Sequence, residues 1–425
     1  MLESVAVGLG DDRARDPFGV NRNAIAQAAV AAVDERGLVA LLAQLVRIRS
    51  YSAGGEEGRI AGFMAEQLTA LGLEATLQEV QPGRFNCVGR WAGAGGGTSL
   101  MLNGHLDTNP AGEGWTRDPL SGEVDESFVY GIGVSNMKAA DAAYVAAVQA
   151  VQRAGACLRG DVVLAFVVGE LQGGVGTVHL LRQGVRADRF IVGEPTDLAV
   201  LTLHAGSLEF ELVTRGRTRH LSKMEEGVDA IAQMVRAMQA LRAMSFSGPD
   251  RPEYRGVRRL AIGVIQGGLG PEYHDWRPSL LADRCRIRFA VRYGPGQTPE
   301  TVQADIEAVL DGLRRADPDF VADLRPNRGP HRLVMEPFEV ASDADIVHTV
   351  ADAHRAVLGQ APLVGSIAPY KFYGTDAAHL ARADMLGVVY GPGGKYNTMP
   401  DERVEIRDLC AAARVYARTI VATCA

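Results

Sequence analysis

The sequence is poor in lysine, cysteine and aromatic residues, and these shortages narrow the class of protein. Only four of the 44 basic residues are lysines and the net charge is -7, so no basic run suits a nucleic-acid backbone. The five cysteines are scattered and odd in number, which argues against a disulfide framework or a cysteine-rich zinc knot. No long uninterrupted apolar run and no signal-peptide pattern occurs. We therefore expect a cytoplasmic protein without nucleic-acid or membrane partners.

The length of 425 residues predicts two domains, and 47% hydrophobic with 22% charged residues is typical of a globular protein. Residues 1–23 show no periodicity and are expected to form a loose arm. Short apolar runs at 99–102, 162–168 and 190–192 alternate with helical segments such as 139–151. This alternation predicts an α/β sheet with both faces covered.

The pattern changes near residue 206. Residues 207–213 and 285–291 alternate strictly between apolar and polar side chains, as expected for half-exposed strands. The helix predicted between them carries one apolar stripe, consisting of Val228, Ile231, Val235 and Met238. We therefore predict a catalytic α/β domain from residues 1–205 and 326–425, with an α+β sandwich inserted at 206–325.

The chemistry is first indicated by the segment Asn-Gly-His105-Leu-Asp107, at the end of an apolar strand. Residues i and i+2 of a strand point to the same side, so both side chains can enter one cleft. His105 would ligate a metal while Asp107 orients the ring. A hydrogen-bonded pair at a strand end is the alternative interpretation.

Three further loops place polar residues after strands or before a helix. A glycine-rich loop carries Asn136 and Lys138, Glu170 is followed by Leu171, and Glu194 precedes Pro-Thr. Sites in α/β sheets form where strand ends meet. Taken singly, each loop is also consistent with an ordinary turn.

In order and spacing, these segments resemble the M20 family of dinuclear-zinc peptidases and aminoacylases, especially its acetylornithine deacetylase and succinyl-diaminopimelate desuccinylase branch. The resemblance runs from Leu38 to Arg407. It implies a zinc-peptidase-like catalytic domain with an inserted lid, and a homodimer formed through that lid. Further matching segments are Trp115 with Asp118-Pro119, Gly216 before His220, Arg292 before Pro295-Gly296, Gly374-Thr-Asp376, Gly391-Pro-Gly393 and Pro400-Asp-Glu402.

The resemblance also shows that the zinc site is degenerate. Of five ligand positions in the family, His105 and Glu194 match two. Asn136 stands at the bridging aspartate, Leu171 at the second glutamate of a Glu-Glu pair, and Thr398 at a late histidine. Leucine cannot ligate, and a neutral amide brings no charge to a bridge between two cations. We expect no metal, or one divalent metal (zinc) at low occupancy.

Other family residues are retained. The resemblance assigns Glu170 as general base, Asp107 as the orienting carboxylate and His220 as a lid histidine that reaches across a dimer. The residues that it implies for substrate binding are Arg292, at a substrate carboxylate, and Asn136, Asp376, Gly393 and Thr398.

All four lysines fall in motif loops. Lys371 and Lys395 lie in the two C-terminal loops that should face the metal site, and Lys223 follows His220 by three residues. An ammonium group could supply part of a zinc ion's positive charge and polarise a carbonyl. Ordinary solvated lysines are the alternative.

Three functions remain open. The favoured one is an enzyme acting on an amide or acyl C–N bond of a small amino-acid-derived substrate, by hydrolysis or by acyl transfer, condensation or cyclisation. A second is a zinc deacylase with shifted ligands, such as His379, Asp376 or His274. A third is a non-catalytic binding or partner subunit.

Overall fold

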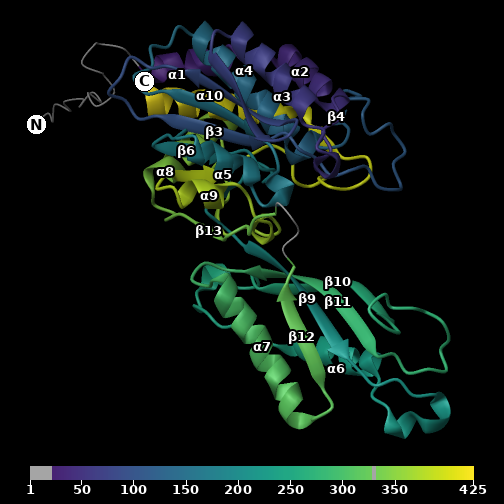
Figure 1. The fold of residues 1–425 in the computed structure, drawn as a ribbon. Coiled ribbons are helices and arrows are strands. Elements are labelled where there is room, and N and C mark those ends of the chain that lie inside the picture. The colour runs from purple at the N-terminus through teal and green to yellow at the C-terminus, as the bar shows by residue number, and fades with distance from the viewer. Residues whose placement is uncertain (1–21, 328–331) are drawn as a thin grey trace, which may run out of the picture.

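The computed structural model describes residues 22–327 and 332–425, which form two bodies (Figure 1). The larger is a layered α/β body, and the smaller lies below it in the view of Figure 1. The loose arm predicted at 1–23 falls almost entirely outside the described residues.

The larger body is built on an eight-stranded sheet of order β1-β2-β5-β3-β6-β15-β7-β14. Its central strands β5, β3, β6 and β15 run parallel, so their carboxyl ends meet at one edge. The strands are β1 (Glu74–Gln81), β2 (Arg84–Trp91), β3 (Leu100–His105), β5 (Val162–Val167), β6 (Arg189–Val192), β7 (Val200–Leu201), β14 (Val364–Gly365) and β15 (Leu386–Val389).

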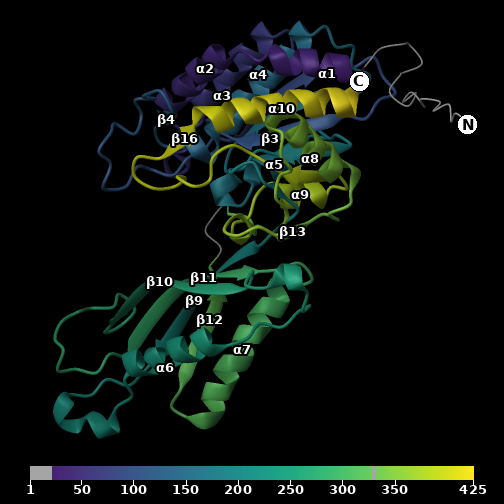
Figure 2. The ribbon, with the colours of Figure 1, turned by 180° about the vertical axis from the view of Figure 1, so that it is seen from behind.

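Helices cover both faces of this sheet, which confirms the predicted fold class. The alanine-rich α4 is almost wholly buried and packs against α10, where the Tyr144 and Tyr416 ring centroids are 4.7 Å apart (Figure 2). One core contains α1 (Arg22–Ala31), α2 (Glu35–Arg47), α3 (Gly58–Ala70), α4 (Ala139–Arg153), α8 (Asp345–Leu358) and α10 (Ile406–Cys424); the other contains α5 (Val175–Arg182) and α9 (Ala377–Ala381).

The smaller body, called the lid below, is an antiparallel sheet of order β10-β11-β9-β12 with two helices against one face (Figure 2). The predicted alternation in β11 is confirmed, because Cys285, Ile287, Phe289 and Val291 are buried while the intervening Arg286 and Arg288 are not. The lid elements are β9 (Gly206–Arg215), α6 (Ala230–Ala243), β10 (Arg259–Gly268), β11 (Arg284–Tyr293), α7 (Pro299–Ala316) and β12 (Val321–Pro326).

The predicted apolar stripe of α6 is partly wrong. Ile231 and Val235 are 42% and 45% exposed, whereas Met234, Ala237 and Leu241 form the buried face. The helix has apolar residues on two sides, and the side that contains Ala237 packs on the sheet. The side that contains Ile231 and Val235 is exposed.

Two short ladders complete the described fold: β8 (Leu203–His204) with β13 (Phe338–Glu339), and β4 (Phe128–Tyr130) with β16 (Arg403–Glu405). All five cysteines are free. Across the described residues, no helix combines the length and hydropathy needed to cross a membrane.

Candidate active site

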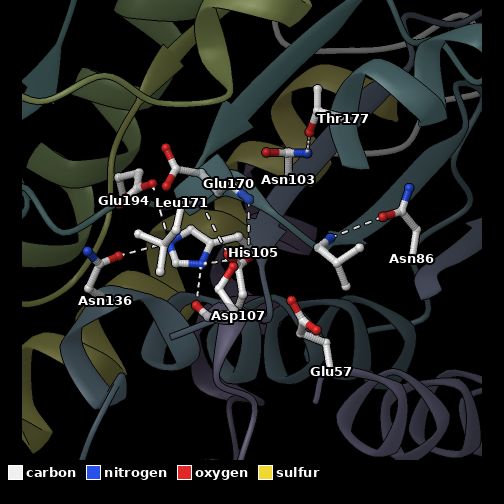
Figure 3. A network of polar contacts seen from close by, with 12 residues as sticks. Glu57, Asn86, Asn103, His105, Asp107, Asn136, Glu170, Leu171, Thr177 and Glu194 are labelled. Atoms are coloured by element: carbon white, nitrogen blue, oxygen red, sulfur yellow. Dashed lines mark hydrogen bonds and ion pairs between the residues drawn. The ribbon is translucent and has the colours of Figure 1, made fainter. Parts of the chain in front are cut away.

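His105 lies at the carboxyl end of β3 and is 2% exposed. Its Nδ1 is 2.8 Å from the Asp107 carbonyl oxygen, and its Nε2 is 2.9 Å from Asn136 Oδ1 and 3.5 Å from Glu194 Oε1 (Figure 3). Both ring nitrogens lie close to oxygen atoms, an arrangement that suits a doubly protonated, positively charged ring. Burial lowers the pKa of His105, but the carboxylates of Glu194 and Asp107 more than offset this and raise it to about 10.

The Asp107 carboxylate contacts both the His105 ring and the backbone of a neighbouring turn. Its carboxylate oxygens accept the backbone N–H groups of Glu170 and Leu171, each at 3.2 Å, and Oδ1 is 3.7 Å from His105 Nδ1. The Asp107 main-chain carbonyl orients the histidine, while its carboxylate holds the turn η4 (Glu170–Gln172) in place (Figure 3).

His105, Glu170 and Glu194 form a group that could hold one metal ion, since their ligand atoms all lie within 4.8 Å of one another. Burial and the neighbouring Glu194 carboxylate raise the pKa of Glu170 well above its ordinary value. A metal bound here would have to displace the proton on His105 Nε2, because only a free ring nitrogen ligates. The donor set suits one divalent cation.

The residues do not fit a second metal. Asn136, Leu171 and Thr398 line the same cavity beside His105, and among them they offer no carboxylate and no imidazole. The nearby Glu402 is buried and accepts the backbone N–H groups of Ser135 and Asn136 at 2.9 and 3.1 Å. It holds the glycine-rich loop in place.

The shifted ligands considered from the sequence do not assemble with this group. His274 is exposed on the lid, with Nε2 3.9 Å from Glu272 Oε2. His379 Nε2 lies 2.8 Å from the Gly173 carbonyl oxygen. Asp376 is buried within electrostatic reach of His105 but is not a member of the group of three. The prediction that these residues replace the lost ligands is therefore not supported.

A cleft of about 360 Å³ separates the group from the lid. Asn136, Glu170, Glu194 and Thr398 line it from the larger body, and Arg292 of β11 lines it from the lid. Burial lowers the pKa of Arg292, and the Glu170 carboxylate opposes this effect. Arg292 makes no ion pair with any described residue, which leaves its guanidinium available for an anion.

Residues 101–422 match peptidase family M20/M25/M40. The chain belongs to this family. It is 27% identical to N-formyl-4-amino-5-aminomethyl-2-methylpyrimidine deformylase of Bacillus subtilis, covering 87% of this chain and 89% of the relative. It is 29% identical to succinyl-diaminopimelate desuccinylase of Methylorubrum extorquens, covering 88% and 96%. A tripeptidase structure from Staphylococcus aureus shares the fold, with a TM-score of 0.75 and 19% identity over 92% of this chain and 99% of that one.

Several residues predicted for the site of this M20 chain lie elsewhere. Lys371 Nζ donates to the Arg255 carbonyl at 2.9 Å, and Lys395 is exposed with Nζ 5.1 Å from the Tyr396 ring centroid. Neither lysine lines the site cavities, in contrast to the expectation that both face the metal site. His220 is exposed and directly precedes the turn η5 (Leu221–Glu226), and its role in the cleft of a neighbouring subunit stays a prediction.

Gly393 and Asp376, the two remaining candidates for substrate contact, lie outside the linings of both cavities. Gly393 has φ 72°, and an added Cβ would lie 2.4 Å from Ser135 Oγ, so only glycine fits beside the glycine-rich loop. Asp376 is 1% exposed and one of its oxygens lacks a hydrogen-bond partner.

The sequence did not predict a buried ion pair that contacts the turn η4 through Gln172. Arg84 and Glu57 are 5% and 0% exposed at their side chains and pair directly. Arg84 Nη1 also donates to Gln172 Oε1 at 2.6 Å, which ties the turn to β2. The two residues are 27 positions apart and fit no motif, so the sequence offered no signal.

Asp376 generates a prediction about stability and pH. Burial is the main cause that raises its pKa from 3.8 to about 7. The folded state therefore binds a proton that the unfolded state releases, and the resulting stabilisation is lost as the pH rises from about 4 through 7. In the wild type, this group should lower the free energy of unfolding by about 2–4 kcal/mol between pH 4 and pH 8. Asp376→Asn should abolish that decrease.

The measurement is chemical unfolding of both proteins across that range in the presence of a chelator. The exposed Asp250→Asn should keep the wild-type pH dependence. Parallel stability curves for wild type and Asp376→Asn would contradict the prediction.

Proposed function

We propose that this chain hydrolyses the amide bond of a small N-acyl amino acid or dipeptide-like substrate, using at most one divalent metal ion. The observation that carries the proposal is the grouping of Glu170 and Glu194 with His105, beside a cleft that both glutamates line and whose opposite wall carries Arg292. Across the cleft, Glu170 would act on the amide bond of such a substrate and Arg292 would bind its carboxylate.

Glu170 is the proposed proton carrier. Its ionised form would take a proton from the attacking water, and its raised pKa favours holding that proton until it is delivered to the leaving nitrogen. Asn136 uses its oxygen toward His105, which leaves its amide N–H groups free to donate to the substrate carbonyl. Arg292 would bind the substrate carboxylate.

The relatives support the substrate class only in outline. The two curated relatives are named as a deformylase and a desuccinylase, so both names describe removal of an acyl group. Because this chain differs at Asn136, Leu171 and Thr398, the relatives' names do not identify the acyl group of its substrate.

If a cation binds, His105, Glu170 and Glu194 would hold it, and it would supply positive charge to polarise the carbonyl. We predict no more than one tightly held equivalent per chain, because catalytic zinc sites commonly use three protein ligands and none remain for a second ion. Elemental analysis of protein purified without chelators measures this.

A double variant, Leu171→Glu with Thr398→His, provides the matched test of this reasoning. Restoring a carboxylate and an imidazole to the cavity should add metal-binding capacity beyond that of the wild type. Two tightly held ions in the wild type would contradict the proposal of a single-metal site.

We predict that Glu170→Gln keeps the shape of the site and lowers turnover by about 10²–10⁴, because it removes the proton carrier. Turnover is followed as release of the free acyl acid, which distinguishes hydrolysis from acyl transfer. The exposed Glu126→Gln should retain wild-type activity. Unchanged turnover in Glu170→Gln would remove this role, and tight binding without wild-type turnover would favour a non-catalytic binding subunit.

We also propose a homodimer through the lid. β10 is an edge strand of the lid sheet, so one side of its backbone is open for pairing. Ile231 of α6 lies beside Gly267 of β10, which brings exposed apolar side chains of both elements near each other. These exposed residues are Ile231, Val235, Val264 and Ile265. Apolar surface along an open edge is characteristic of an interface.

The dimer prediction is tested by a charge at this edge. Wild-type protein at micromolar concentration should sediment with twice the mass of the 45.3 kDa chain. Ile265→Glu should shift it toward the monomer, whereas Leu363→Glu, at a position 69% exposed on the larger body, should not. A wild-type monomer would count against the dimer and against a role for His220 in a neighbouring cleft.

A further inference from the structure

A second cavity, called the side cavity below, adjoins the lid cleft. It measures about 160 Å³ and shares Asn109, Asn136, Leu171 and Thr398 with the cleft. A cavity of about 150 Å³ with apolar walls is large enough for benzene. The side cavity can therefore accept a phenyl ring or a branched chain of similar size.

Apolar side chains supply most of what a guest would touch. Two of the carboxylates that line the side cavity already have partners, since Asp107 accepts the Glu170 and Leu171 N–H groups and Glu402 accepts those of the glycine-rich loop. The buried Thr108 Oγ1, also in the lining, has no hydrogen-bond partner among the described residues. The apolar lining residues are Pro110, Trp115, Ile132, Leu171, Met399 and Pro400.

Two of the positions that differ from the family's ligand pattern contribute to the lining of the side cavity. Leu171 and Thr398 both line the side cavity, and they stand where the family resemblance places a glutamate and a histidine that bind the second metal. Leu171 lies beside the His105 ring in Figure 3. An isobutyl group and a small hydroxyl-bearing side chain thus replace two metal-binding groups at the inner end of the cavity.

We propose that the side cavity binds the apolar acyl group of an N-acyl amino acid, an aryl or branched acyl group of about six carbons, while Arg292 binds the carboxylate. This rests on the proposed function and specifies its substrate class. The shared wall of Asn136, Leu171 and Thr398 places the junction of the two cavities beside His105 and Glu194. The amide bond would lie at that junction.

The test measures binding separately from turnover. N-acetyl-, N-hexanoyl- and N-benzoyl-alanine are titrated calorimetrically into full-length Glu170→Gln protein. Each buried methylene should tighten binding by about fourfold, so the benzoyl and hexanoyl compounds should bind at least about tenfold more tightly than the acetyl compound.

Variants in the Glu170→Gln background locate the effect. Trp115→Ala changes only the side cavity, so it should reduce the advantage of the larger acyl groups by several-fold and leave N-acetyl-alanine binding nearly unchanged. Leu171→Asn, similar in size but polar, should also reduce that advantage. Retained acetyl binding shows that the variant is folded. Leu363→Asn, on the exposed surface, should preserve the whole series.

Equal affinities across the series, equal weakening of every compound by Leu171→Asn, or no binding by any member would overturn the proposal. The proposed activity can fail independently. A graded binding series without wild-type turnover would support the acyl pocket and reject hydrolysis, whereas wild-type turnover restricted to the acetyl compound would support hydrolysis and reject the pocket.

Discussion

The organisation of the site depends on a buried positive charge at His105. Its ring is held between the Asp107 carbonyl and Asn136 Oδ1, and nearby carboxylates keep it protonated. Unpaired buried anions are costly, and burial accordingly raises the pKa values of Asp141, Glu170, Glu194 and Asp376, which favours their protonated forms. The carboxylates within electrostatic reach of the ring are Asp107, Asp141, Glu170, Glu194 and Asp376.

The altered ligand positions are consistent with this charge balance. In the family resemblance, Asn136 stands for an aspartate and Leu171 for a glutamate, so the two changes remove two negative charges. A second divalent cation would bring two positive charges. Losing the cation and both acidic ligands together leaves the net charge of the site unchanged, whereas losing the cation alone would leave uncompensated buried anions. This balance gives a physical reason why Glu170 and Glu194 remain while Leu171 does not ligate.

The sequence predicted the features that follow from local periodicity and motif order. The buried strand before His105, the alternation in β11 and the convergence of Glu170 with Glu194 all belong to this class. It did not predict which stripe of α6 faces the sheet, because both are apolar and tertiary packing selects one. Nor could it orient Lys371, whose Nζ finds a carbonyl acceptor 116 positions away in the chain.

The lid position is linked directly to the proposed proton carrier. β9 leaves the larger body and β12 returns toward it as hydrogen-bonded neighbours, so the lid is attached through two adjacent segments. On the returning segment, Leu333 N–H donates to the Gln172 carbonyl at 2.9 Å, and Gly173 has φ 84° where an added Cβ would meet the Leu333 carbonyl oxygen at 2.1 Å. A lid movement that shifts Leu333 would therefore pull on the turn that begins with Glu170. The contacts of Leu333 therefore link the segment that returns from the lid to the turn that carries Glu170, the proposed proton carrier.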